Sequence, residues 1–478
     1  MALMVILAVA ALQSLAWDIA LPAFQGPDED THFAYIQHLA ETGELPSPSS
    51  GGTAYSSEEE QALVSLNLLP TIGDLGGRPA WSKVDLEAWH AQERALTAAA
   101  RGNGAGPNPI AKNPPLYYAT MSIPYRVFVW LPLLKRLFVL RLFNALCYLA
   151  TIALTWLIAG EVFGRALWKQ ALAAGVVALE PQLAFMSAVI NADNLLIALM
   201  TGLLLAALRL VKRGPTMTRV LACAVLAGAA VLTHGRGLVA LPVLVVAYGV
   251  AWLRFRPTPR DTLTRGAAAA ATVGAAFGAY AWLGRSGGGS LYGGQVGELN
   301  NGGFNLRQLL SSIYQFYFPR LRSMRARLGP EYGYRQVFIE SFYGRFGSLE
   351  VTFSERTYDA LQVLSALGLV GLYTAVVARW RALLDAWPVL VVLVSLLVTN
   401  VVFLHYVSYR ALLGDGGGDP LIVGRYLLPM VSLLGLAIAF TAGALPRRLG
   451  PLLGAMILAL GVLLSLGGIG IAMARFYA

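Results

Sequence analysis

The sequence is that of an all-α polytopic membrane protein, as three observations indicate. Of its 478 residues, 56% are hydrophobic and only 13% are charged, and the mean hydropathy is +0.60. The apolar residues are gathered in blocks of about twenty, the length that an α-helix needs to cross a hydrocarbon core of about 30 Å. Short clusters of Lys and Arg fall in alternate connections between these blocks, which is the pattern that sets membrane orientation.

The first apolar block, residues 1–22, is interpreted as an uncleaved first transmembrane helix, because it lacks a basic N-terminal region and carries Trp17 and Asp18 near its end. A transmembrane bundle is expected over residues 138–283, and C-terminal transmembrane helices over residues 358–478. The predicted later spans lie at residues 138–160, 170–190, 194–211, 218–234, 237–253, 266–283, 358–378, 386–405, 425–444 and 451–473. About eleven transmembrane helices are therefore expected.

Two large loops interrupt these spans, at residues 23–137 and 284–357. Placing every Lys/Arg cluster in the cytoplasm puts both loops on the extracytoplasmic side. Within the first loop, residues 115–134 are apolar but are interrupted by Pro124 and Pro132. A single crossing there would break the alternation, so this stretch is expected to lie in the interface or to dip in and return.

Charge and cysteine usage exclude two classes of function. The net charge is +10, but the basic residues lie between apolar blocks and form no basic soluble face, so nucleic-acid binding is not expected. Cys147 and Cys223 both fall inside predicted spans, which leaves neither a disulfide framework nor a cysteine metal site. We expect them to be small core residues.

A dense acidic cluster follows directly on the first span, in "GPDEDTHFAYIQHLAETGELP" at residues 26–46. Gly26-Pro27 predicts a helix start, with glycine at the cap and proline at the first helical position. Asp28, Glu29 and Asp30 then occupy the first turn, where the helix dipole stabilises negative charge.

The spacing of this helix places Asp28, His32 and Tyr35 on one face and Phe33 and Ile36 on another. Two interpretations are open. The acids are ordinary capping residues of a surface helix, or an ionised carboxylate is held at the membrane boundary as a general base or a cation ligand.

The acidic stretch, together with "NPPLYY" at residues 113–118, resembles the GT-C glycosyltransferases, integral-membrane enzymes that use lipid-linked sugar donors. These motifs are similar to those of the aminoarabinose and protein-mannosyl transferases and to those of an uncharacterised bacterial membrane family, a domain of unknown function, in the same superfamily. "NADNLL" at 191–196, "ESFYGRFGSLEV" at 340–351 and "GRYLLP" at 424–429 support the uncharacterised family. The resemblance spans nearly the whole chain. It implies a GT-C fold in which the extracytoplasmic loops carry helices lying along the membrane.

The resemblance also implies site residues. Asp28 matches the catalytic acid that deprotonates the acceptor hydroxyl, and Glu29 or Asp30 would assist by orienting the acceptor or binding a cation. Asp193 matches the second acidic position, although it is also placed to cap the following span. In "AKNPPL" the chain has Lys112 where aminoarabinose transferases carry a glutamate-lysine pair, so the two-carboxylate arrangement of that subgroup is not expected, and Lys112 is a candidate phosphate ligand.

Transfer of a sugar from a polyprenyl phosphate also needs positive charge for the departing phosphate. Arginines near the outer membrane boundary are candidates, and the alternative is that they anchor span ends or contact anionic headgroups. The predicted catalytic residues are Asp28, Glu29 and Asp193. The predicted substrate-binding residues are Asp30, His32, Lys112, Asn113, Tyr117, His234, Arg236, Arg320, Arg322, Arg345, Arg425 and Tyr426. No metal ligand is predicted and no cofactor is expected to be required, with a divalent cation left open.

The resulting hypothesis is an inverting glycosyltransferase of the bacterial inner membrane, multi-pass, with its active site on the extracytoplasmic side. It would move a monosaccharide from a polyprenyl-phosphate donor to a cell-envelope glycan or lipid-linked acceptor in polysaccharide biosynthesis. The alternatives are a transporter or flippase, or a polymerase or ligase, of lipid-linked sugars. Transporters place functional charges near the midplane, whereas here the charges cluster at the outer boundary.

Overall fold

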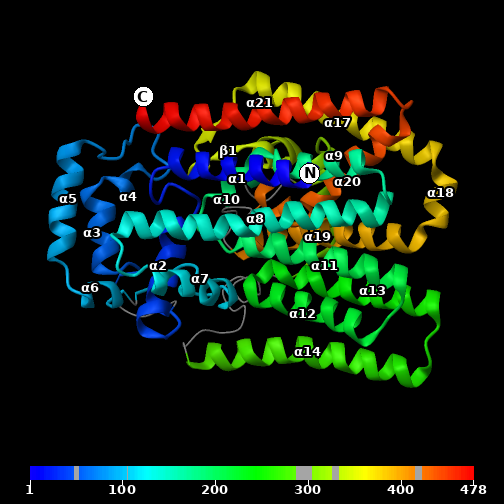
Figure 1. Ribbon diagram of the computed structural model, residues 1–478, viewed down its shortest axis with the longest axis horizontal. Coiled ribbons are helices and arrows are strands. Elements are labelled where there is room, and N and C mark those ends of the chain that lie inside the picture. The colour runs from blue at the N-terminus through cyan, green and yellow to red at the C-terminus, as the bar shows by residue number, and fades with distance from the viewer. Residues whose placement is uncertain (48–52, 105, 287–303, 326–332, 415–421) are drawn as a thin grey trace.

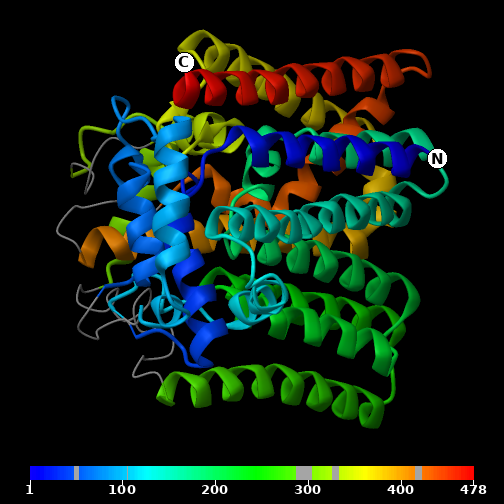
Figure 2. The ribbon, with the colours of Figure 1, turned by 60° about the vertical axis from the view of Figure 1, so that its left-hand side comes forward.

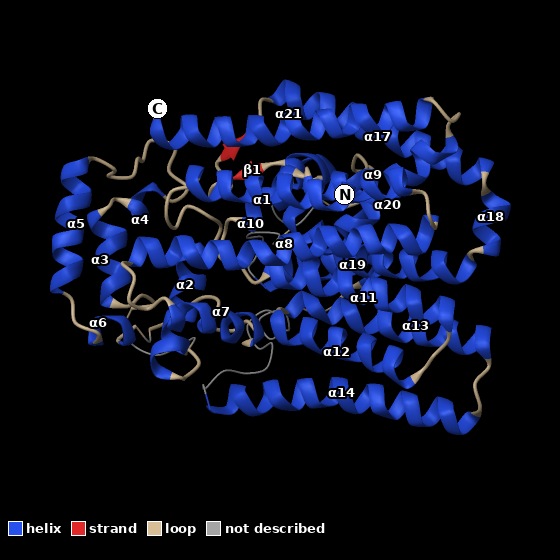
Figure 3. Cartoon of the chain, viewed as in Figure 1, coloured by secondary structure: helices blue, strands red, loops and turns tan. Residues whose placement is uncertain are grey.

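The structure is a computed structural model that describes residues 1–478 apart from 48–52, 105, 287–303, 326–332 and 415–421. Long helices lie side by side with their axes roughly aligned (Figures 1 and 3). Among the described residues there is a single two-stranded antiparallel hairpin, β1 (Arg345–Phe346) with β2 (Val351–Thr352). The prediction of an all-α membrane protein is confirmed.

Among the residues that the structure describes, nine helices are long and apolar enough to cross a membrane. They are α1 (Ala2–Ala20), α8 (Leu133–Phe163), α11 (Asp193–Arg213), η1 with α13 (Gly235–Phe255), α14 (Pro259–Ser286), α17 (Glu355–Ala378), α19 (Trp387–Gly414), η4 with α20 (Gly424–Ala444) and α21 (Leu449–Tyr477). Two shorter apolar helices, α9 (Leu167–Ala178) and α12 (Met217–Thr233), occupy the positions of two further predicted spans. Each of the eleven predicted spans therefore has an apolar helix.

One predicted span is not continuous. The stretch 170–190 is divided into α9 and the seven-residue α10 (Pro181–Ser187). Pro181 cannot continue a helix from the preceding turn, because it has no amide hydrogen. Glu180 accepts hydrogen bonds from the backbone N–H groups of Gln182 and Leu183, so its side chain caps the new helix at the break.

Successive spans alternate in direction and define two ends of the bundle. The Lys/Arg-rich connections and the short crosswise helix α18 (Trp380–Asp385) lie at one end, and the two large loops and the C-terminus lie at the other (Figure 1). The alternation of basic connections is what the sequence predicted. We call the end that carries the loops the loop end.

The first loop is a small helical domain at the loop end. It contains α2 (Glu29–Thr42), α3 (Ser57–Ser65), α4 (Leu68–Thr71), α5 (Lys83–Ala95), α6 (Ala99–Gly102) and α7 (Leu116–Val127). α3 and α5 stand crosswise to the spans (Figures 1 and 2). α7 has only 12 residues, too few to cross a bilayer, so residues 115–134 do not form a single crossing.

The second loop ends against the bundle in short elements. These are α15 (Leu306–Tyr317), the π-helix η3 (Arg335–Glu340), α16 (Ser341–Tyr343) and the hairpin of β1 and β2. Gly424 at the start of η4 (Gly424–Met430) donates its backbone N–H to Ser341 Oγ at 2.6 Å. A Cβ at Gly424 would lie 2.2 Å from the backbone nitrogen of Phe342, so only glycine permits this approach.

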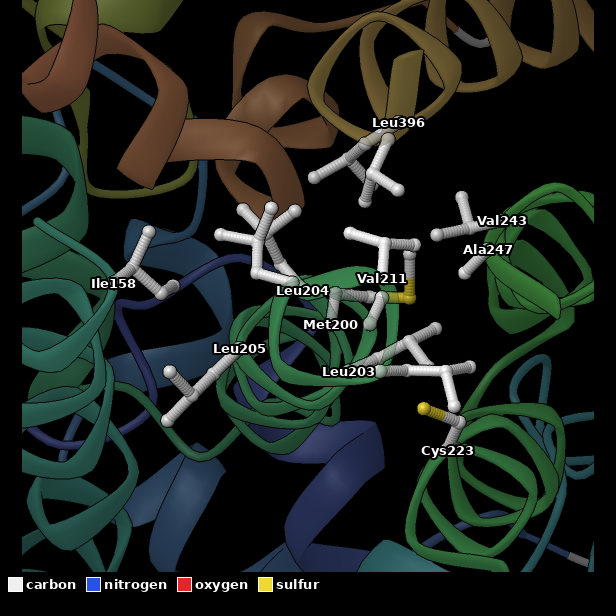
Figure 4. Close-up of a cluster of buried hydrophobic side chains, with 14 of the residues drawn as sticks. Ile158, Met200, Leu203, Leu204, Leu205, Val211, Cys223, Val243, Ala247 and Leu396 are labelled. Carbon is white, nitrogen blue, oxygen red and sulfur yellow. The ribbon is translucent and has the colours of Figure 1, made fainter. Parts of the chain in front are cut away.

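The core of the bundle surrounds α11. Its side chains Met200, Leu203 and Leu204 pack with Cys223 of α12 and Leu396 of α19, all of them at most 1% exposed (Figure 4). Cys223 is thus the small core residue that was expected, and both cysteines are free thiols. Asp193 is the first residue of α11, a mostly buried helix, and lies at the loop end.

Candidate active site

The backbone between α1 and α2 is tightly packed. A Cβ on Gly26 would lie 2.4 Å from Val189 Cγ1, so this position requires glycine. The helix begins at Glu29, not at Gly26-Pro27 as predicted, and Asp28 is its N-cap residue in the left-handed conformation, with φ of 57°. Aspartate tolerates that conformation better than most residues. The Asp28 side chain caps nothing within the described helix, and this frees it for another contact.

Asp28 points to the bundle. Its Oδ2 accepts a hydrogen bond from an Arg425 NH2 group at 3.1 Å. The Asp28 side chain is 55% exposed and the Arg425 side chain only 11%. The first residues of the first loop and the "GRYLLP" motif, 397 positions apart, therefore meet at the loop end.

Asp193 binds a second arginine beside this pair. Its Oδ1 accepts a short hydrogen bond from Arg236, and its side chain is only 3% exposed. The Arg236 guanidinium lies over the ring of Tyr426, 3.9 Å from its centroid, and the His234 Nδ1 accepts the backbone N–H of Arg236. "NADNLL", the stretch "THGRG" at residues 233–237 and "GRYLLP" thus contribute to one cluster.

Both arginines keep buried N–H groups without an acceptor among the described residues. These groups are NH1 of Arg236 and both Nε and NH1 of Arg425. Leaving a buried donor on a charged group unsatisfied is costly, so such groups usually have a ligand or ordered water as partner. Two guanidinium groups with spare donors make an anion-binding surface next to the Asp28 carboxylate.

His32 joins the cluster to the "NPPLYY" motif. The hydroxyl of Tyr118 lies 2.9 Å from His32 Nδ1, and Asn113 Nδ2 donates to the same hydroxyl at 3.1 Å. Burial lowers the pKa of His32 to about 4, although the carboxylates of Asp28 and Asp193 oppose that shift. His32 is therefore a neutral imidazole near pH 7.

The tyrosines of this motif form a buried wall. The rings of Tyr35 and Tyr118 stack with centroids 3.6 Å apart, and the Tyr117 hydroxyl donates to Asn144 Oδ1 at 3.1 Å. The expected face of α2 is confirmed in this respect, because His32 and Tyr35 both meet Tyr118.

Glu29 has another role than the one expected. It is 0% exposed, and its two oxygens accept hydrogen bonds from Arg141 Nε at 2.8 Å and NH2 at 2.5 Å. The backbone N–H of Ile190 adds a third hydrogen bond at 3.0 Å. Glu29 is therefore inaccessible to a substrate, and its two oxygens already accept three hydrogen bonds. The expectation that Glu29 is catalytic is not supported, and its contacts instead position the start of α2.

Asp30 also faces away from the cluster. Its Oδ2 accepts the hydroxyl of Tyr55 at 2.5 Å inside the first loop, and burial raises its pKa. The completely buried Glu59 interacts electrostatically with it, and burial raises the pKa of Glu59 well above its usual range. Asp30 is thus part of the loop's internal network and not of the site, contrary to expectation.

Four other expected residues do not join the cluster in any contact between described residues. Lys112 lies just before "NPPLYY", and its carbonyl accepts the hydroxyl of Tyr280 at 3.0 Å. Arg320 and Arg322 are exposed after α15. Arg345 in β1 is 3.4 Å from Glu340 Oε2, and its backbone N–H donates to Gln182 at 2.9 Å.

A family model described as "Predicted membrane protein (DUF2142)" matches residues 12–434. The chain belongs to this family. The matched residues include the whole cluster, from Asp28 to Tyr426. No curated protein is significantly similar to this DUF2142 chain.

The similarity of the DUF2142 chain to solved structures is weaker than its match to the family model. ArnT from Cupriavidus metallidurans in the apo state is 15% identical with a TM-score of 0.46, over 93% of this chain and 60% of that one. An oligosaccharyltransferase from Archaeoglobus fulgidus has the same identity and TM-score, over 99% of this chain and 56% of that one. The chain thus spans little more than half the length of either.

Among the residues that the structure describes, no group of three His, Cys, Asp or Glu side chains lies close enough to hold a metal ion. The two acids of the cluster are instead paired with Arg425 and Arg236. We derive no step through a metal.

Three contributors to the DUF2142 site were not predicted from the sequence. Arg141 holds Glu29, Tyr118 contacts His32, and Ser341 fixes Gly424 beside Arg425. Arg141 carried a usable signal, because a charged residue within an apolar span is a functional or positioning residue by default. Ser341 and Gly424 lie in two of the quoted motifs, but their contact was not predictable from either motif, since it joins segments 83 positions apart.

Proposed function

We propose that this protein is a membrane glycosyltransferase of GT-C type that uses a polyprenyl-phosphate monosaccharide as donor. The observation that carries the proposal is a half-exposed carboxylate, Asp28, beside two mostly buried arginines with spare N–H donors. A base and an anion-binding surface in contact are the two groups that transfer from a phosphate-linked sugar to a hydroxyl requires.

Asp28 is the acid of the cluster suited to act as base. Its side chain is 55% exposed, whereas Glu29 and Asp193 are 0% and 3% exposed. An acceptor hydroxyl can reach only an accessible carboxylate within hydrogen-bond distance. Arg425 orients that carboxylate through Oδ2.

In the proposed step, the acceptor oxygen attacks the anomeric carbon as its proton passes to Asp28. The bond between that carbon and the donor phosphate oxygen breaks, and the phosphate keeps the electron pair. Arg425 and Arg236 stabilise the charge that develops on it through N–H groups that have no acceptor among the described residues. A single displacement of this kind inverts the anomeric carbon.

The other members of the cluster hold these groups in place. Asp193 and Tyr426 fix the Arg236 guanidinium from two directions. His32, neutral near pH 7, adds no charge beside Asp28 and is held by Tyr118. We place the site at the extracytoplasmic face of the bacterial inner membrane, since the basic connections lie at the opposite end of the bundle, and we propose a cell-envelope glycan or lipid-linked sugar as acceptor.

The test is transfer of radiolabelled sugar from polyprenyl phosphate to envelope lipid and glycan extracts by the purified protein. Asp28→Asn is expected to lower the rate by about 100- to 10,000-fold, the contribution of a general base. Glu44→Gln, an exposed acid in the same loop, serves as the matched control and should keep the rate. Movement of donor lipid across the bilayer with no glycoside formed would overturn the proposal in favour of transport.

A further inference from the structure

A cavity of about 240 Å³ lies at the loop end, on the side of Glu29 that Arg141 occupies. Its walls come from the end of α1, the start of α8, the first loop and the end of α21, and include Asp18, Trp81, Phe138, Arg141 and Tyr477. It is open on one side. None of the predicted site residues lines it.

The cavity contains an incompletely paired carboxylate. Asp18 Oδ1 is 3.5 Å from Arg141 NH1, whereas Asp18 Oδ2 has no hydrogen-bond partner among the described residues. Arg141 gives its two shortest contacts with carboxylates to Glu29. Two carboxyl groups therefore share one guanidinium, in a place where the Asp18 side chain is 1% exposed. A buried carboxylate oxygen calls for a cation or a hydrogen-bond donor.

The remaining walls suit an ammonium group attached to a lipid. Phe138, Tyr477 and Trp81 are among the residues that line the cavity, and aromatic side chains attract cations. The indole Nε1–H of Trp81 is buried and has no acceptor in the described part of the chain, so it can donate to a phosphate or ester oxygen. Ile19 and Tyr477, which are 66% and 50% exposed, stand at the rim where acyl chains would continue along α1 and α21.

We propose that this cavity is a binding site for the primary ammonium of an aminophospholipid headgroup, with Asp18 as the acceptor for the ammonium and Trp81 as the donor to the headgroup oxygens. The ammonium supplies the second positive charge that Asp18, Glu29 and Arg141 lack. Anionic lipids without an amine are disfavoured because two carboxyl groups face one guanidinium. The bound lipid braces Arg141, and through Glu29 the start of α2.

The experiment compares phosphatidylethanolamine with phosphatidylcholine, a lipid of equal net charge whose headgroup has no N–H donor. Purified, delipidated protein is titrated with each lipid and the bound lipid is counted by native mass spectrometry. Phosphatidylethanolamine is expected to bind about tenfold more tightly, the effect of one charge-assisted hydrogen bond. Free ethanolamine forms a second arm, which shows whether the ammonium alone suffices to compete.

Asp18→Asn keeps the shape of the side chain and leaves Arg141 paired with Glu29. It should abolish the preference for phosphatidylethanolamine, and Trp81→Phe, which removes only the N–H donor, should reduce binding several-fold. Glu44→Gln is the control and should bind as the unchanged protein does. Equal binding of both lipids, or an undiminished preference in Asp18→Asn and Trp81→Phe, would overturn the proposal.

Discussion

Near the start of α2 lie Arg141, which is buried, and the mostly buried pair Arg425 and Arg236, and these arginines differ in how many of their N–H groups have an acceptor. Arg141 donates to both oxygens of Glu29 and to the carbonyls of Leu21 and Pro22. Arg425 and Arg236 each reach one acid and keep buried N–H groups without an acceptor in the described structure.

Under the proposed function, this difference separates an arginine that stabilises the fold from two arginines that bind the substrate. A buried ion pair whose donors are all used gains from its internal contacts and leaves no guanidinium N–H group for a ligand. Under the proposed function, the N–H groups of Arg425 and Arg236 that lack an acceptor among the described residues are the ones that meet the donor phosphate. Mutations and a change of pH test this difference between the arginines.

The largest effect is expected at the satisfied arginine. Arg141→Met leaves the fully buried Glu29 charged and unpaired, so the free energy of unfolding should fall by about 3–5 kcal/mol. Thermal unfolding in nanodiscs of fixed lipid composition measures this decrease in stability. Replacing Glu29 by Met as well should recover part of the loss, because one uncompensated charge is then removed. Unchanged stability of the Arg141→Met protein would show that Arg141 does not differ from Arg425 and Arg236 in its contribution to the fold.

The unsatisfied arginines should respond in activity and not in stability. Arg425→Lys keeps the charge but loses the planar fork, so we expect transfer to slow by about 10- to 100-fold. Its unfolding midpoint should stay close to that of the unchanged protein. Arg320→Lys, at an exposed position outside the cluster, is the matched control and should be active. A large loss of stability in Arg425→Lys would show that Arg425, like Arg141, stabilises the fold.

The backbone between α1 and α2 is tested at Gly26. A methyl group there would overlap Val189, so Gly26→Ala should destabilise the protein by about 2 kcal/mol. It should also shift Asp28 and lower activity. Gly249→Ala in α13, where a Cβ meets nothing within 4 Å, should be neutral or stabilising. If Gly26→Ala behaves like that control, the close approach is unimportant.

The smallest effect near neutral pH is expected from the protonation of His32. Burial lowers the pKa of His32 from its usual 6.5 to about 4, so the unfolded chain binds the proton more readily between those values. Stability is therefore complete above pH 6.5 and falls as pH decreases towards 4, by roughly 0.7 kcal/mol between pH 7 and pH 6 for this one group. His32→Gln should flatten that part of the profile, and an unchanged slope would show that His32 is not buried as a neutral group.

The sequence predicted the spans and the acidic cluster because both are local signals. Blocks of apolar residues identified the eleven predicted spans. The span predicted at 170–190 is divided into α9 and α10, and Pro181 in the sequence was a signal for that break. The motifs around Asp28, Asn113, Asp193 and Arg425 were found individually. Their meeting was not predictable from spacing, because the contact between Asp28 and Arg425 joins positions 397 apart.

By itself, the sequence determined that this chain crosses a membrane many times and presents carboxylates and arginines at one end of its bundle, because length and hydropathy are properties of each segment alone. Only the tertiary structure decided which of those charges is available. Asp28, Glu29 and Asp30 are consecutive, yet the backbone directs them to three different partners, which are Arg425, Arg141 and Tyr55. Burial and partners, which the folded neighbours supply, separate the candidate base from the acids that only hold it in place.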